Sequence, residues 1–210
     1  MDETADGRTA MWDARYAPAP YSYGEAANGF LVAQAPRLKP GMQALVPGDG
    51  EGRNGVWLAE QGLTVDTLDL SAQGVAKARR LAAARGVALN AMQADALAWA
   101  WPSDAYDLVA LIYLHLDPDG RRFLHAKALA ALRRGGWLIL EAFRPEQLAA
   151  QAAGARGGPR EARLLYRRAD LAADFAGQDI VELAEASTVL EEGALHVGAS
   201  ELVRAVVRRV

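Results

Sequence analysis

The residues with the clearest capacity for chemistry form one short glycine-rich stretch. Its three glycines alternate with two acids, in the order Gly48-Asp49-Gly50-Glu51-Gly52-Arg53-Asn54. An apolar run precedes the stretch and a helix-forming run follows it, so we expect a turn between a buried strand and a helix. Open α/β sheets hold nucleotide-like ligands at such turns. The stretch therefore predicts a ligand site.

Two kinds of ligand fit this spacing. Gly50, Gly52 and Gly55 match the dinucleotide fingerprint, with Asp69 about 20 residues further on as an acid for a ribose. A pyrophosphate, however, needs backbone N–H groups and no nearby anion. S-adenosylmethionine (SAM) has no phosphate and presents a sulfonium and an ammonium, which suit Asp49 and Glu51. We favour SAM over NAD; a turn that binds nothing, with both acids solvated, is the third alternative.

Composition limits the class of protein. A chain of 210 residues with 51% hydrophobic and 23% charged residues suits one globular α/β domain. There is no apolar run of membrane-spanning length and no secretory signal, so we expect a cytoplasmic protein without membrane insertion. The chain has no cysteine, which excludes disulfides, thiolate nucleophiles and cysteine metal sites. A net charge of -3 with mixed signs indicates a small-molecule substrate and no nucleic acid.

The region before the glycine-rich stretch is aromatic. Residues 1–10 predict no regular structure, and 28–38 predict a helix. Trp12, Tyr16 and Tyr23 bring large aromatic area with polar tips, which suits a lid over a ligand. The alternative is a staple that holds an N-terminal helix on the sheet, and the sequence leaves both open.

Strands and helices alternate through the rest of the chain, which is typical of a parallel sheet with crossover helices. Ser71 and Gly86 predict the start and the end of one of these helices. The strands are expected at 43–46, 64–68, 87–93, 106–113, 137–143, 179–190 and 201–210. The last two have no helix between them and should pair antiparallel. We expect one domain, 1–210, with an N-terminal lid or helical segment (1–40), a cofactor-binding core (41–143), and a substrate loop with a C-terminal hairpin (144–210).

Residues with a chemical role gather at the carboxyl ends of the expected strands, where α/β sheets bind ligands. Asp69 can accept hydrogen bonds from both ribose hydroxyls, and Asp95 with Ala96 can meet an adenine. Beyond these, the candidates at this edge are Tyr113, His115, residues 141–144 and His196. His125 is interpreted as a packed structural histidine. The histidine spacing supports no metal site.

Together these residues resemble the class I SAM-dependent methyltransferases, and within them the small bacterial group of tellurite-resistance and thiopurine methyltransferase-like enzymes. The resemblance is carried by Trp12-Asp13-x-x-Tyr16, Tyr23-Gly24, the stretch Gly48 to Asn54, Asp69-Leu70-Ser71, Asp95, Leu132-x-x-Gly135-Gly136 and Glu192-Gly193-x-x-His196.

The resemblance implies a Rossmann-like, mostly parallel seven-stranded sheet with helices on both faces, in the order 3-2-1-4-5-7-6 with strand seven antiparallel. It implies Gly48 and Gly50 against the methionine moiety, Asp69 with Leu70 at the ribose, Asp95 with Ala96 at the adenine, and the backbone near Tyr113 beneath the sulfonium. Trp12, Tyr16, Tyr23, Asp49, Glu51, Arg53 and Asn54 complete the expected cofactor site.

Methyl transfer to a small molecule, such as a thiol or oxyanion, needs an aligned acceptor and exclusion of water. Tyr113, His115 and His196 are the catalytic candidates; the two histidines can accept a proton from a neutral acceptor. Arg144 is a candidate for holding an anionic acceptor, alongside Arg163, although a solvated surface role fits both. An NAD(P)-binding oxidoreductase and a non-catalytic SAM-binding protein are the alternative functions. Either a monomer or a homodimer fits the sequence.

Overall fold

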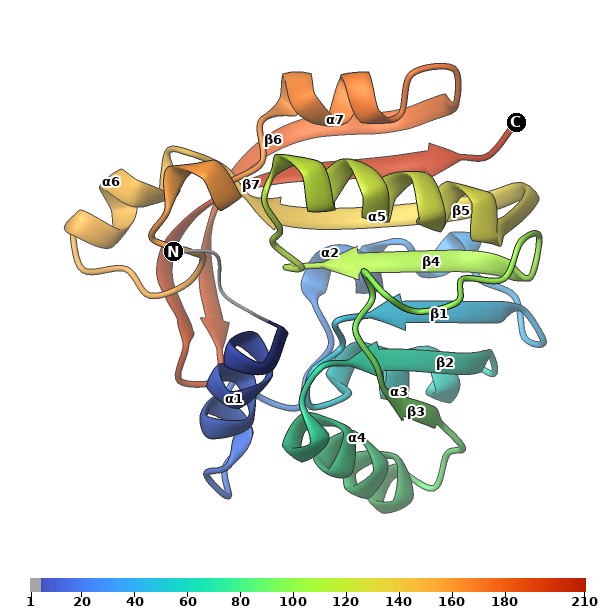
Figure 1. Cartoon of the computed structure of the whole chain (residues 1–210), viewed down its shortest axis with the longest axis horizontal. Coiled ribbons are helices and arrows are strands. Elements are labelled where there is room, and N and C mark those ends of the chain that lie inside the picture. The colour runs from blue at the N-terminus through green and yellow to red at the C-terminus, as the bar shows by residue number, and fades with distance from the viewer. Residues whose placement is uncertain (1–4) are drawn as a thin grey trace. The chain divides into compact units, whose positions relative to one another are not determined.

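The protein is described by a computed structural model that covers residues 5–210 (Figure 1). It divides into two compact units, one ending at Ala100 and the other beginning at Trp101. Among the described residues, seven strands form one sheet in the order β3-β2-β1-β4-β5-β7-β6. The expected fold class and strand order are therefore confirmed.

The first unit carries three parallel strands and their crossover helices. Ser71 begins α4 by accepting a hydrogen bond from the Gly74 N–H, and Gly86 ends it with φ 68°; both were expected from the sequence. Val65 and Leu68 of β2 are buried, as a central strand requires. The elements of this unit are α1 (Ala5–Tyr16), α2 (Gly29–Ala33), a 3-10 turn (Ala35–Arg37), β1 (Gln43–Pro47), α3 (Arg53–Glu60), β2 (Thr64–Asp69), α4 (Ala72–Arg85) and β3 (Asn90–Gln93).

The second unit combines a parallel pair with a long hairpin. β4 and β5 are parallel, whereas β7 is antiparallel to both β5 and β6. Helices α5 and α7 pack side by side over the strands (Figure 1), and Arg121 of α5 forms an ion pair with Asp174 of α7. The elements are β4 (Tyr106–Ile112), α5 (Pro118–Ala131), β5 (Leu132–Phe143), α6 (Gln147–Ala152), a 3-10 turn (Ala162–Leu164), α7 (Arg168–Asp174), β6 (Asp179–Glu192) and β7 (His196–Arg208).

The sequence prediction was wrong at several element ends. Residues 5–10 belong to α1, because Arg8 is held by an ion pair with Asp95 at 2.9 Å; residues 1–4 lie outside the described part. β5 begins at Leu132, which pairs with Tyr106, and not at 137. β7 begins at His196 and not at 201, because the hairpin with β6 is paired from its first residue. The expected helix 28–38 is a short α2 followed by a 3-10 turn.

None of the helices within residues 5–210 is both long enough and apolar enough to cross a membrane.

Candidate functional site

The glycine-rich turn of the first unit lies between β1 and α3 and needs its glycines for shape. Gly50 has φ 58°, a region that side chains other than glycine rarely adopt. A Cβ atom on Gly50 would lie 2.5 Å from the Tyr16 hydroxyl oxygen. Gly50 is therefore required by both backbone conformation and close packing.

Most of the backbone N–H groups of this turn donate hydrogen bonds within the protein. Those of Gly48 and Asp49 donate to the Leu68 carbonyl at 2.7 and 3.3 Å. The Gly52 N–H donates to the Asp49 carbonyl at 3.0 Å, and the Gly55 N–H donates to the Asp49 carboxylate at 3.0 Å. Phosphate-binding turns point such N–H groups at the ligand. This turn does not, so it is poorly suited to a diphosphate.

Asp69, the last residue of β2, connects the turn to the next helix. Its two carboxylate oxygens accept hydrogen bonds from the Gly50 N–H and the Ser71 N–H, both at 2.8 Å. Burial raises the pKa of Asp69 to about 6, although these two hydrogen bonds oppose the rise. At neutral pH the group is therefore mainly ionised. A carboxylate offers about four lone-pair sites, so two backbone donors leave capacity for further ones.

The charge of Glu51 is matched inside the protein. Its carboxylate lies 2.6 Å from the Lys77 ammonium, and both side chains are only 3% exposed. The Ser22 N–H donates to the other carboxylate oxygen at 2.7 Å. Glu51 thus holds the N-terminal segment and α4 together. The sequence-based argument that Glu51 offers an uncompensated negative charge to a ligand is not supported by these contacts.

Asp49 points toward the first turn of α3. One carboxylate oxygen accepts from the Gly55 N–H, whereas the other is buried with no hydrogen-bond partner among the described residues. Burial raises the pKa of Asp49 to about 8, and the negative charge of Asp69 contributes to the rise. Asp49 is therefore mainly protonated at neutral pH when the site holds no cation.

This raised pKa predicts a pH-dependent stability that Asp49→Asn removes. The folded state favours the protonated carboxyl, so the stabilisation is complete below the ordinary pKa of 3.8 and is lost as pH rises through about 8. Between pH 5 and pH 8.5 we expect the parent to lose at least about 2 kcal/mol more unfolding free energy than Asp49→Asn. Urea unfolding at these two pH values measures the difference. Parallel pH profiles for the two proteins would contradict the assignment.

Aromatic side chains of the N-terminal segment lie directly beside the turn. Trp12 stacks on Tyr16 with ring centroids 5.5 Å apart, and Tyr23 meets Tyr16 edge-on at 6.4 Å. Burial and the nearby Asp69 raise the pKa of Tyr16 well above its ordinary value, so it stays a neutral phenol. Asp13 accepts a hydrogen bond from the Ser71 hydroxyl at 2.5 Å. These contacts hold α1 beside the turn. Both interpretations of the N-terminal segment, a staple on the sheet and a lid over a ligand, predict such contacts.

Arg53 and Asn54 face the protein and not an open space. The Arg53 guanidinium donates to the carbonyls of Tyr23 and Ala26 at 3.4 and 3.3 Å. The Asn54 side-chain oxygen accepts from the Asn28 N–H at 3.0 Å. Both residues are buried. They therefore anchor the segment that precedes β1.

Asp95 follows β3 and is engaged on both carboxylate oxygens. One accepts from the Leu97 N–H at 2.8 Å, and the other pairs with Arg8 at 2.9 Å. Ala96 is partly buried beside it. The Leu70 carbonyl accepts from the Gln93 side chain at 3.1 Å, which links β2 to β3. Among the cofactor residues expected in the first unit, Asp69 accepts a hydrogen bond from the Gly50 N–H, and its charge acts on Asp49.

In the second unit, Tyr113 follows β4 in an uncommon backbone conformation. Its φ of 54° is unusual for a bulky residue, and such strain gathers at functional sites. The Tyr113 hydroxyl donates to Glu141 at 2.7 Å, and Arg204 donates to the other oxygen of Glu141 at 2.6 Å. The Tyr113 ring stacks on Phe143 at 4.9 Å and meets His196 edge-on at 4.6 Å.

The two histidines of this unit differ in their contacts. Both ring nitrogens of His115 face backbone groups: Nδ1 lies 2.7 Å from the Leu164 carbonyl, and Nε2 accepts from the Phe143 N–H at 3.1 Å. Burial lowers the pKa of His115 to about 4. His115 therefore holds two loops together, and this geometry does not support its expected role in accepting a proton. His196 is buried at the start of β7, with Nδ1 3.2 Å from Glu192.

Arg144 is surrounded by acids. It forms ion pairs with Glu146 at 3.2 Å, with Glu185 at 3.4 Å and with Glu201. Three carboxylates more than match one guanidinium, so the expected role of Arg144 in holding an anionic acceptor is not supported. Arg163 is exposed and pairs with Glu161.

The glycine-rich segment after β5 is hydrogen-bonded to side chains of α6. Gln151 donates to the carbonyls of Gly157 and Gly158 at 2.7 and 3.1 Å, and Gln147 donates to Gly157 at 3.2 Å. A Cβ atom on Gly157 would lie 3.0 Å from the Phe143 ring and 3.2 Å from His196. This backbone therefore packs directly on the aromatic residues of the second unit.

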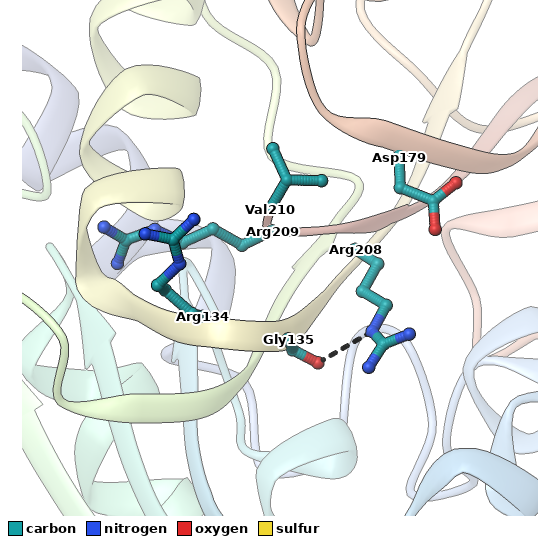
Figure 2. Close-up of a pocket in the computed structure, with 6 residues that line it drawn as sticks. All are labelled: Arg134, Gly135, Asp179, Arg208, Arg209 and Val210. Carbon is teal, nitrogen blue, oxygen red and sulfur yellow. Dashed lines mark hydrogen bonds between the residues drawn. The ribbon is translucent and has the colours of Figure 1, made fainter.

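A shallow surface pocket lies at the other end of the strands of the second unit. Figure 2 shows Arg208 turned toward the Gly135 carbonyl, 3.4 Å away, while Arg134 extends in a different direction. Its lining residues are Arg134, Gly135, Asp179, Arg208, Arg209 and Val210. Across residues 5–210, no cluster of three or more His, Asp or Glu residues could hold a metal ion.

The sequence analysis missed the partners that hold the site residues. Lys77 occupies the buried stripe of α4 with Gly74, Ala78 and Leu81, and a lysine at that spacing is a signal for a buried acid. Arg204 lies directly across from Glu141 in the β5–β7 pairing. That register became visible only with the folded hairpin.

Sequence and structure comparisons give consistent results. Residues 44–136 match the family described as a methyltransferase domain. No curated protein sequence matches the chain significantly.

Several solved structures share the fold. TehB from Haemophilus influenzae has a TM-score of 0.72 at 15% identity, with 97% of this chain and 67% of that chain covered. Magnesium protoporphyrin IX methyltransferase (ChlM) from Synechocystis PCC 6803, solved with bound S-adenosylhomocysteine (SAH), has a TM-score of 0.61 at 22% identity, covering 97% and 84%. A protein from work on the conversion of a disulfide bond into a thioacetal group in echinomycin biosynthesis has a TM-score of 0.78 at 23% identity, covering 96% and 91%. These matches, all below 25% identity, show a shared fold.

Proposed function

We propose that this chain is a class I SAM-dependent methyltransferase that transfers a methyl group from SAM to a small-molecule acceptor. In this proposal residues 41–143 form the cofactor-binding core, and residues 144–210 carry the substrate loop and the C-terminal hairpin. The main observation in support is the glycine-rich turn. Its N–H groups at Gly48, Asp49, Gly50, Gly52 and Gly55 all donate hydrogen bonds to other groups of the protein. Such a turn suits a cofactor without phosphate.

The residues of the first unit fit SAM. The buried carboxyl oxygen of Asp49 that has no partner gives a cationic ligand a group to interact with. Asp69 retains acceptor capacity for the ribose hydroxyls. The Tyr16 ring lies beside Gly50, and Trp12, which stacks on Tyr16, adds aromatic surface next to it. SAM, when bound, supplies a methyl carbon on a positively charged sulfur.

The chain's own contribution is to orient the reactants and to exclude water. The packed aromatic cluster of Tyr113, Phe143 and His196 provides a rigid, dry wall for the acceptor. Orientation and desolvation can supply most of the acceleration, and no covalent intermediate with the protein is needed. Tyr113 and His196 are the proposed catalytic residues of the second unit.

Two binding and transfer experiments test this proposal. Calorimetry should detect SAM and SAH binding in the micromolar range or tighter and no binding of NADH. Incubation with radiolabelled SAM should then transfer the label to at least one compound in a panel of thiols, amines, hydroxyl compounds and oxyanions. Binding of NADH without SAH would favour the oxidoreductase alternative. Binding of SAH without any methyl transfer would favour a non-catalytic SAM-binding protein.

The proposal also covers the class of acceptor, the location of the protein and its oligomeric state. The net charge of -3 supports a small molecule over nucleic acid as acceptor. We place the protein in the cytoplasm, as a monomer or homodimer.

A further inference from the structure

The side chain of Tyr113 is oriented by a hydrogen bond in which its hydroxyl proton points toward Glu141. Its hydroxyl donates to Glu141 Oε1 at 2.7 Å, and its backbone N–H donates to the Glu141 carbonyl at 2.8 Å. A phenol has one proton, so a proton held by Glu141 leaves the Tyr113 oxygen to act toward any substrate as an acceptor.

Glu141 is held as firmly as Tyr113. Its side chain is 1% exposed, and Arg204, the residue directly across in β7, donates to Glu141 Oε2 at 2.6 Å. A buried carboxylate keeps its charge when it is paired and hydrogen-bonded. Tyr113, Glu141 and Arg204 therefore form a continuous path from a partly buried phenol, through a buried carboxylate, to a partly exposed guanidinium.

The surroundings of Tyr113 favour an uncharged acceptor over an anion. Its ring contacts Phe143 and His196, and His196 Nδ1 lies 3.2 Å from the Glu192 carboxylate. The nearby cations are matched, Arg204 by Glu141 and Arg144 by three glutamates. An oxyanion or carboxylate placed here would meet acids and would find these cations already paired.

His196 is less suited than Tyr113 to meet the acceptor. It is 6% exposed, and the backbone of Gly157 covers its Cδ2 edge closely. The strained φ of 54° at Tyr113, by contrast, holds a partly buried side chain beside the end of β4.

We propose that Tyr113 and Glu141 form a proton relay, and that the methyl acceptor is a neutral hydroxyl or amine group that loses its proton through this relay. The acceptor oxygen or nitrogen forms the new bond to the methyl carbon, and the carbon–sulfur bond breaks with its electron pair remaining on sulfur. The acceptor's proton passes to the Tyr113 oxygen as the Tyr113 proton passes to Glu141 Oε1. After the product leaves, the proton returns from Glu141 Oε1 to the Tyr113 oxygen as Tyr113 gives its own proton to water. This inference rests on the proposed methyl transfer.

The test compares Tyr113→Phe with the parent on a series of phenols of decreasing pKa, using radiolabelled SAM. With phenols that are un-ionised at the assay pH, we expect kcat to fall at least about 100-fold, because general base catalysis contributes that much or more. With nitrophenols that are already ionised, no proton has to leave, so kcat should change less than about threefold. A merely structural role for Tyr113 would lower both rates equally.

Further measurements separate this inference from the proposed function. SAH affinity, measured by calorimetry, should be the same in Tyr113→Phe and in the parent within about twofold. Glu141→Gln should show the same dependence on acceptor ionisation, provided that its SAH affinity shows it to be folded. Asp119→Asn, an acid-to-amide change at an exposed position of α5, is the matched control and should leave all rates unchanged.

Several outcomes would overturn the relay. The first is an equal loss of kcat in Tyr113→Phe for ionised and un-ionised phenols. The second is methyl transfer by the parent only to anions such as selenite or benzoate. The third is no methyl transfer by the parent to any phenol or amine. In each case SAH binding with transfer to any other acceptor would leave the proposed function intact. Absence of SAH binding would remove both.

Discussion

Replacing Lys77 by methionine is expected to lower the free energy of unfolding by about 3–5 kcal/mol, the usual cost of leaving one partner of a buried ion pair alone. The Lys77 ammonium has three acceptors, the Glu51 carboxylate at 2.6 Å and the carbonyls of Pro18 and Pro20 at 2.5 and 2.9 Å. Its loss leaves the Glu51 charge buried and detaches the segment before β1. Urea unfolding at pH 7 measures the change.

Two further variants show whether the buried charge is the cause. The double variant Glu51→Gln/Lys77→Met should recover part of the loss, because the amide needs no cation. Lys39→Met, at an exposed position, is the matched control and should stay within about 0.5 kcal/mol of the parent. A Lys77→Met protein as stable as the parent would show that the ion pair does not hold the segment.

Replacing Asp69 by alanine should weaken SAH binding at least about 100-fold. A hydrogen bond to a charged group contributes about 1.5–3 kcal/mol, and Asp69 is proposed to accept from the ribose while it also holds the Gly50 and Ser71 N–H groups. Asp69→Asn keeps one acceptor oxygen, so its SAH affinity should fall less, by about tenfold. Calorimetry with SAH gives both values.

Asp66, an acid on the same strand, provides the control for this substitution. Its carboxylate accepts from the Asn90 side chain at 2.8 Å, away from the turn. Asp66→Ala should therefore bind SAH with an affinity within about twofold of the parent. Unchanged SAH affinity in a folded Asp69→Ala would remove Asp69 from the site.

The sequence predicted much of the fold because its signals are local. Ser71 and Gly86 mark the two ends of α4, since a hydroxyl cap and a left-handed glycine act within a few residues. Asp69 was placed at the turn from its position after a buried strand. The strand order came from the resemblance to a family.

The contacts that decide the site were beyond sequence reasoning because they join distant residues. Glu51 and Lys77 are 26 positions apart, and their pairing reverses the inference drawn from an acidic turn. His115 looked like an exposed loop base, yet the Leu164 carbonyl and the Phe143 N–H occupy its two nitrogens. Asp49 has a pKa of about 8 through burial, which spacing alone does not reveal.

Crystals of the protein grown with equal concentrations of SAH and NADH test the central claim most directly. The account predicts density for SAH alone, with the ribose hydroxyl oxygens within about 3.2 Å of the Asp69 carboxylate and the amino acid end beside Gly50. A diphosphate lying across Gly50, or SAH bound away from Asp69, would contradict it.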